Sequence, residues 1–131
     1  MIVIDASVAV SAASASDGFS FLDGEDLVAP ALLWSETVSA LHLATWRGLV
    51  SRELAREALE RFVSAPIKQR RDRTLLKAAW EIADDLGWAR TYDAEYVALA
   101  RILECPLVTL DARLRRGASR LIDVVGPTEL Q

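Results

Sequence analysis

The sequence predicts an α/β fold: a mainly parallel central sheet flanked by helices. Short apolar runs of strand length alternate with longer segments of helical periodicity, an order typical of parallel sheets. Of the 131 residues, 52% are hydrophobic and 26% are charged, which is the composition of a chain that buries a core. Neither an internal repeat nor a linker interrupts the alternation. We therefore expect one domain spanning residues 1–131.

The first strand is expected in the segment IVIDAS, residues 2–7, where apolar β-branched residues run directly into Asp5. The next segment, residues 7–18, is rich in Ser and Ala and predicts a short or frayed helix. A second strand is expected at the start of DLVAPALLW, residues 26–34. Pro30 ends that strand and suits the first turn of a following helix.

Two helices joined by a short turn are expected after the second strand, forming a helical hairpin. The first covers residues 32–48 and ends at Gly48. The second begins at Ser51, a suitable N-cap, and carries an apolar stripe made of Leu54, Ala58, Leu59, Phe62 and Val63.

The remaining segments continue the alternation. Residues 66–73 predict a short, charged edge strand, and residues 74–86 a helix that ends at Gly87. Residues 91–104 predict a helix opening near Asp93. Strands are expected in PLVTLD, residues 106–111, and LIDVVGP, residues 121–127.

Charge and composition narrow the class of protein. The net charge is −4, and neither a signal peptide nor an apolar membrane-spanning stretch is recognisable, so a soluble, cytoplasmic protein is expected. Cys105 is the only cysteine, which excludes an internal disulfide and a cysteine-based zinc site. We interpret it as a buried thiol.

Four carboxylates stand at corresponding places in the predicted fold. Asp5 and Asp111 end strands, whereas Glu36 and Asp93 lie in the first turns of helices. Ligands of open α/β sheets bind beyond the carboxyl ends of the strands, so the four acids are expected to converge. Simpler roles remain open: Asp93 and Asp111 could be helix N-caps, and Glu36 could face solvent.

Several carboxylates in one cleft repel and raise one another's pKa, a conflict that a divalent cation removes. Oxygen ligands favour Mg²⁺ or Mn²⁺, and the only histidine, His42, is interpreted as a surface or packing residue. Such an ion can activate water and stabilise the leaving oxygen in phosphodiester cleavage. The sequence thus points to metal-dependent phosphate chemistry.

Four blocks resemble the PIN-domain ribonucleases and, within them, the VapC-type toxins of bacterial toxin–antitoxin pairs. The blocks are IVIDASV, APALLWSETVSAL, TYDAEYVALA and PLVTLDARLRR, and together they span nearly the whole chain. Each block alone is weak, but four in this order and spacing are specific.

The resemblance implies Mg²⁺- or Mn²⁺-dependent endoribonuclease activity, with Asp5, Glu36, Asp93 and Asp111 as catalytic metal ligands and Ser7 and Thr109 as supporting hydroxyls. It also implies a homodimer and inhibition by a cognate VapB-type antitoxin, in a hetero-tetramer or larger assembly. By the same analogy, an antitoxin helix would lie in a groove of the helical hairpin. Ser39 departs from the family pattern, because many relatives carry Asn there to support the second acid.

Further roles are predicted for basic and aromatic residues. Arg113 and Arg116, just beyond Asp111, are expected to bind RNA phosphates. Trp34, Trp46 and Trp80 are interpreted as core or subunit contacts.

Two alternatives to a ribonuclease remain open. One is an RNA-binding module that has lost catalysis. The other is a phosphatase with Asp5 as the nucleophile, although Ser7 stands where such sites need a second acid.

Overall fold

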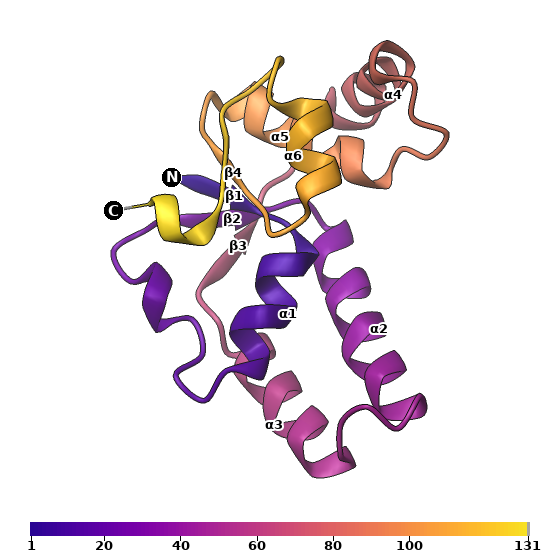
Figure 1. Cartoon of the computed structure of the whole chain (residues 1–131). Helices are drawn as coiled ribbons and strands as arrows, with labels where there is room; N and C mark the ends of the chain where they lie inside the picture. The colour runs from indigo at the N-terminus through magenta and orange to yellow at the C-terminus, as the bar shows by residue number, and fades with distance from the viewer. Residues whose placement is uncertain (131) are drawn as a thin grey trace.

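Five short parallel strands form the central sheet of the structure, a computed structural model that describes residues 1–130 (Figure 1). In chain order the strands are β1 Ile2–Ile4, β2 Leu27–Ala29, β3 Ile67–Gln69, β4 Leu107–Val108 and β5 Val124–Val125. Their spatial order is β3-β2-β1-β4-β5, and every neighbouring pair is parallel. Val3 of the central strand pairs with Val28 on one side and Leu107 on the other. The predicted α/β fold is confirmed.

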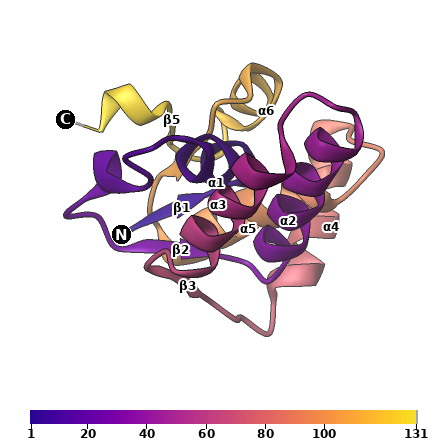
Figure 2. The ribbon, with the colours of Figure 1, turned by 90° about the horizontal axis from the view of Figure 1, so that it is seen from below.

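Six α-helices surround the sheet in the described chain, and five of them pack in two groups. The helices are α1 Ala6–Ser14, α2 Leu32–Trp46, α3 Arg52–Val63, α4 Leu75–Leu86, α5 Tyr92–Leu103 and α6 Ala112–Ala118, with short 3₁₀ turns η1 Ser20–Leu22 and η2 Pro127–Glu129. Helices α1, α2 and α3 pack together below the sheet in Figure 1, and α4 and α5 pack together above it. Figure 2, seen from below, shows α1 and α3 in front of the strands and α5 behind them. The core therefore lies on both faces of the sheet, which explains why β1, β2 and β4 are fully apolar.

Helix α1 is a short helix with one side buried in the core. It runs for nine residues, and Val8, Ala9, Ala12 and Ala13 on one side are buried. The expectation of a short helix is confirmed, and the small side chains let α1 pack closely against α2 and α3.

The helical hairpin formed by α2 and α3 is confirmed. The Ser51 side chain caps α3 by accepting a hydrogen bond from the Leu54 amide at 3.1 Å. The predicted stripe of α3 is only partly covered: Phe62 is buried, whereas Leu54 and Val63 are exposed.

The other elements follow the predicted order with shorter strands. Strand β3 forms an edge of the sheet, and α4 ends at Gly87, whose φ of 71° is the left-handed conformation that glycine adopts at helix C-termini. Strand β4 ends at Val108, three residues before the expected end. The chain leaves the sheet there because Asp111 caps the start of α6.

Two tryptophans are not in the core. Trp46 is 81% exposed and Trp80 is 65% exposed, so the core interpretation is wrong for both, and a subunit contact remains a prediction. Trp34 is partly buried against the core, its ring centroid 6.4 Å from that of Phe62. Cys105 is half-buried, and this burial raises the pKa of its thiol. None of the described helices combines the length and apolar character needed to cross a membrane.

Candidate active site

The four predicted acids lie at the ends of elements that meet beyond the carboxyl edge of the sheet. Asp5 follows β1, Asp111 follows β4, Glu36 lies in α2 and Asp93 in α5. The pKa of Asp93 is raised, mainly by burial and then by the negative charges of the other three acids. Residues far apart in the sequence therefore act on one another electrostatically.

Asp5 is the most buried of these acids, with 5% of its surface exposed. Its Oδ1 accepts hydrogen bonds from the Ser7 hydroxyl at 2.6 Å and the Val8 amide at 3.2 Å, and its Oδ2 accepts one from the Thr109 hydroxyl. Burial raises the pKa of Asp5, and the three donors partly oppose that rise. Two donors from α1 and one from the residue that follows β4 thus fix a carboxylate at the end of a buried strand.

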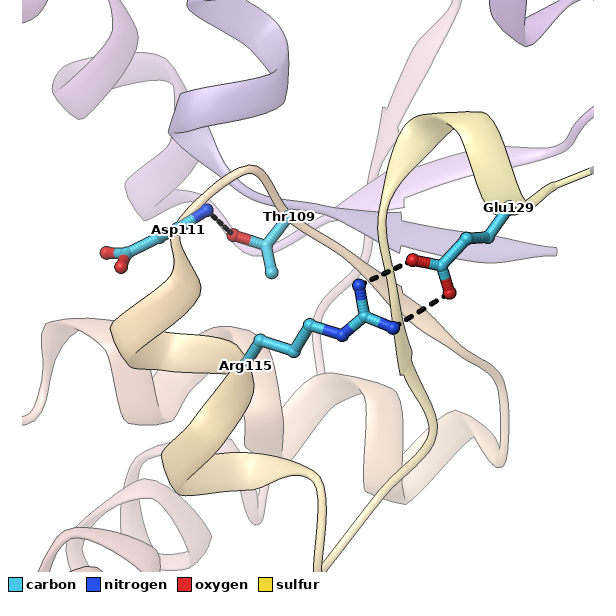
Figure 3. Close-up of polar contacts among 4 residues, drawn as sticks. All are labelled: Thr109, Asp111, Arg115 and Glu129. Atoms are coloured by element: carbon cyan, nitrogen blue, oxygen red, sulfur yellow. Dashed lines mark hydrogen bonds and ion pairs between the residues drawn. The ribbon is translucent and has the colours of Figure 1, made fainter.

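Ser7 and Thr109 connect the ends of β1 and β4. The Ser7 hydroxyl also accepts a hydrogen bond from the Leu110 amide at 3.0 Å. The Thr109 hydroxyl accepts one from the Asp111 amide at 3.0 Å (Figure 3). Both hydroxyls therefore hold the loop that carries Asp111 against the loop that carries Asp5.

Asp111 is the N-cap of α6. Its Oδ1 accepts hydrogen bonds from the amides of Arg113 at 2.9 Å and Leu114 at 3.3 Å. Its Oδ2 accepts no hydrogen bond from the part of the chain that the structure describes, and the carboxylate is exposed. Capping uses one oxygen and leaves the other available to a ligand.

Asp93 does not cap its helix. Thr91 occupies the N-cap position, and Asp93 is the second residue of α5. The N-cap interpretation of Asp93 is wrong, so its carboxylate is not engaged by the backbone of the helix start.

Glu36 is held by a residue that sequence reasoning missed. The hydroxyl of Tyr96, a side chain with 1% exposure, donates a hydrogen bond to Glu36 Oε1 at 2.5 Å. Burial, this bond and the nearby carboxylates raise the pKa of Tyr96. Ser39 is exposed and makes no hydrogen bond to Glu36 among residues 1–130, so Tyr96 supplies a donor for this acid. The helical spacing of Tyr96, three residues after Asp93, was the signal that could have identified it.

A surface pocket of about 580 Å³ opens beside two of the acids, and we call it the Tyr92 pocket. Its walls include two acids, two arginines and two aromatic residues: Glu36, Asp93, Arg90, Arg113, Trp88 and Tyr92. Arg113, predicted to bind phosphate, lines this pocket, whereas Arg116 is exposed on α6 and does not. The sequence analysis missed Arg90, Trp88 and Tyr92, which lie in and just after the turn between α4 and α5.

The donor set suits a hard divalent cation, although the side chains are not gathered into a coordination shell. Within residues 1–130, no three acidic, histidine or cysteine side chains lie close enough together to hold a metal ion as they stand. The four acids offer only oxygen ligands, and His42 is exposed on α2, where it lines a groove between α2 and α3. Burial and, after it, the charges of the other three acids raise the pKa of Asp93, and a bound cation would relieve both costs of the ionised carboxylate.

Comparison with known proteins identifies the family. Residues 2–119 match the PIN domain. The chain is 38% identical over 116 residues to the VapC ribonuclease Mb0985 of Mycobacterium bovis. This alignment covers 87% of this chain and 88% of that protein. It is 32% identical over 121 residues to the ribonuclease VapC12 of Mycobacterium tuberculosis, covering 89% and 92% of the two chains.

Two solved structures share the fold. PAE2754 from Pyrobaculum aerophilum superposes with a TM-score of 0.79 at 23% identity, over 98% of this chain and 85% of that one. VapBC2 from Rickettsia felis, bound to a DNA fragment from its promoter, superposes with a TM-score of 0.68 at 14% identity, over 96% and 98%. This chain belongs to the PIN-domain family and, within it, to the VapC ribonucleases.

Proposed function

We propose that this chain is a divalent-metal-dependent endoribonuclease, the toxin of a toxin–antitoxin pair. Asp5, Glu36, Asp93 and Asp111 would hold Mg²⁺ or Mn²⁺. One observation supports the proposal: four carboxylates from separate segments lie where their elements meet beyond the carboxyl edge of the sheet, and burial together with the charges of the other three raises the pKa of Asp93. When bound, the ion supplies a more acidic water and stabilisation of negative charge on the phosphodiester.

Other residues near the four acids would orient the carboxylates and bind the RNA backbone. The hydroxyls of Ser7 and Thr109 orient Asp5, and Tyr96 orients Glu36, so these two carboxylates present fixed oxygen atoms. Arg113 lies in the same pocket as Glu36 and Asp93, where its guanidinium can bind a phosphate of the RNA strand. Arg116 is proposed to add a weaker, more distant attraction for the RNA backbone.

Asp5 is poorly suited to act as a phosphatase nucleophile. Both of its carboxylate oxygens accept hydrogen bonds, and the side chain is almost completely buried. A nucleophilic oxygen needs a free lone pair aimed at open space. These contacts disfavour the nucleophile role of Asp5.

The proposed protein partner is a VapB-type antitoxin, by analogy with VapBC2, whose structure contains such a pair. The groove between α2 and α3 offers it an apolar surface that includes Val38, Leu41 and Leu59, with Arg52 and Arg56 at its edge. A homodimer, common in the family, is proposed for the assembly. Size-exclusion chromatography with light scattering would measure this oligomeric state directly.

The decisive experiment compares RNA cleavage by the wild type, Asp5→Asn and Asp93→Asn, with Mn²⁺ and with EDTA. We expect cleavage only by the wild type and only with Mn²⁺. Asp84→Asn is the matched control, because Asp84 is an exposed acid on α4 and should cleave as the wild type does. Full cleavage by Asp5→Asn, or by the wild type in EDTA, would contradict the proposal. RNA binding without any cleavage would instead favour the inactive module.

A further inference from the structure

The Tyr92 pocket joins the acidic site to a surface with the chemistry of a nucleotide site. Glu36 and Asp93 contribute carboxylates to its lining, Arg90 and Arg113 contribute cations, and Trp88 and Tyr92 contribute aromatic rings. These residues come from α2, α5, α6 and the turn before α5. One pocket thus combines candidate metal ligands, cationic groups that can bind phosphate, and aromatic side chains.

The two arginines of the pocket are available to a ligand. Neither Arg90 nor Arg113 forms an ion pair within the part of the chain that the structure describes. Arg115, two residues after Arg113, differs: its guanidinium forms a bidentate ion pair with Glu129, at 2.5 and 2.8 Å (Figure 3). Helix α6 therefore uses Arg115 to fasten the C-terminal turn and leaves Arg113 at the pocket.

The two aromatic residues differ in their surroundings. Tyr92 is 54% exposed at the first position of α5, directly before Asp93. Trp88 is half-buried against α6, so close to Gly117 that a Cβ atom there would lie 2.8 Å from Trp88 Cζ2. Trp88 is thus a wall held by packing, and Tyr92 presents a ring that is partly free to receive a planar group.

We propose that the Tyr92 pocket binds one unpaired nucleotide of the RNA strand beside the phosphate that is cleaved. The base stacks on Tyr92, and Arg90 and Arg113 bind the flanking phosphates. This inference rests on the proposed function for the identity of the substrate as RNA. It adds the residues that receive the nucleotide: Tyr92 for the base, and Arg90 and Arg113 for the phosphates.

A single strand fits these contacts better than a duplex does. Stacking on an aromatic side chain requires a base that has left its own stack, and unpaired bases in loops and ends can do so. In a duplex, both faces of each base are already covered. The pocket therefore selects for unpaired RNA without reading its sequence.

The test measures the affinity for a fluorescent, unstructured RNA oligonucleotide by anisotropy. All proteins carry Asp5→Asn, which lies outside the pocket and prevents cleavage during the measurement. We expect Tyr92→Ala to raise the Kd about 5- to 150-fold, the range for one stacked base, and Tyr92→Phe to leave it unchanged. The matched control is Trp80→Ala, which removes an exposed aromatic ring on α4 outside the pocket.

Two further comparisons separate the base contact from the phosphate contacts. Tyr92→Ala should not weaken binding of an abasic ribose-phosphate strand, since that strand has no base to stack. Arg90→Ala and Arg113→Ala should each reduce the salt dependence of log K by about 0.7, whereas Arg115→Ala should not.

An unchanged Kd for Tyr92→Ala, or duplex RNA that binds as tightly as the single strand, would overturn the inference. Failure of the proposed function gives a different result. In that case wild-type protein would not cleave RNA with Mn²⁺, although Tyr92→Ala would still weaken binding.

Discussion

Replacing Tyr96 by Phe removes one oxygen atom from the acidic site and leaves the buried ring in place. The lost contact is the 2.5 Å hydrogen bond that the hydroxyl donates to Glu36. Hydrogen bonds to charged groups contribute about 1.5 to 3 kcal/mol to stability. Because Glu36 is only partly buried, water can replace the hydroxyl in the variant. We therefore expect the unfolding free energy to fall by about 1.5 kcal/mol, near the lower end of that range.

The same substitution has a signature at alkaline pH. Folding raises the pKa of Tyr96 above its ordinary value of 10.0, so the unfolded chain releases this proton at a lower pH than the folded chain. The stabilising contribution of the protonated hydroxyl is fully present below pH 10 and is lost as the pH rises through the folded-state pKa. Between pH 10 and the folded-state pKa, the wild-type protein should therefore lose about 1.4 kcal/mol of unfolding free energy per pH unit relative to Tyr96→Phe.

Urea denaturation in EDTA, followed by tryptophan fluorescence over a range of pH, measures both effects. Tyr92→Phe is the matched control, because Tyr92 is the only other tyrosine and is exposed. RNA cleavage with Mn²⁺ provides a second readout, in which we expect kcat to fall while the Kd for RNA is retained. If Tyr96→Phe matches the wild type in stability, alkaline slope and kcat, the hydroxyl does not position Glu36.

Three other substitutions test separate parts of the structure. Because the pKa of Asp93 is raised on folding, its ionised carboxylate destabilises the folded protein at neutral pH, and protonation at lower pH removes this destabilisation. Asp93→Asn should therefore raise the Tm in EDTA at neutral pH. The same variant should lack the stabilisation by Mn²⁺, about 2.7 kcal/mol at 100 times the Kd, that differential scanning fluorimetry would show for the wild type. The buried hydroxyl of Thr37 has no hydrogen-bond partner among the described residues, so Thr37→Val should stabilise the protein by about 1 kcal/mol or more in urea titrations. Thr45→Val, whose hydroxyl bonds to the Leu41 carbonyl, should not. Gly117→Ala should displace the Trp88 ring, change the near-ultraviolet circular dichroism and weaken RNA binding; an unchanged spectrum would show that the ring is not fixed there.

Local rules predicted most of the secondary structure. Interactions within a few residues can be predicted from a single sequence. Examples are the apolar strand before Asp5, the N-cap at Ser51 and the helix end at Gly87. The burial of one side of α1 and the exposure of Trp46 could not be predicted in this way, because each depends on which faces pack together.

The order of strands and helices, the four acids near their ends and the family blocks around those acids could all be predicted from the sequence. The groups that support and surround the acids became known from the three-dimensional arrangement. Tyr96 reaches Glu36 across 60 positions of the chain, Thr109 reaches Asp5 across 104, and the Tyr92 pocket draws its walls from four separate segments. Hydrogen bonds and pockets of this kind depend on distances between side chains on different elements, and a sequence pattern encodes spacing along the chain but not those distances.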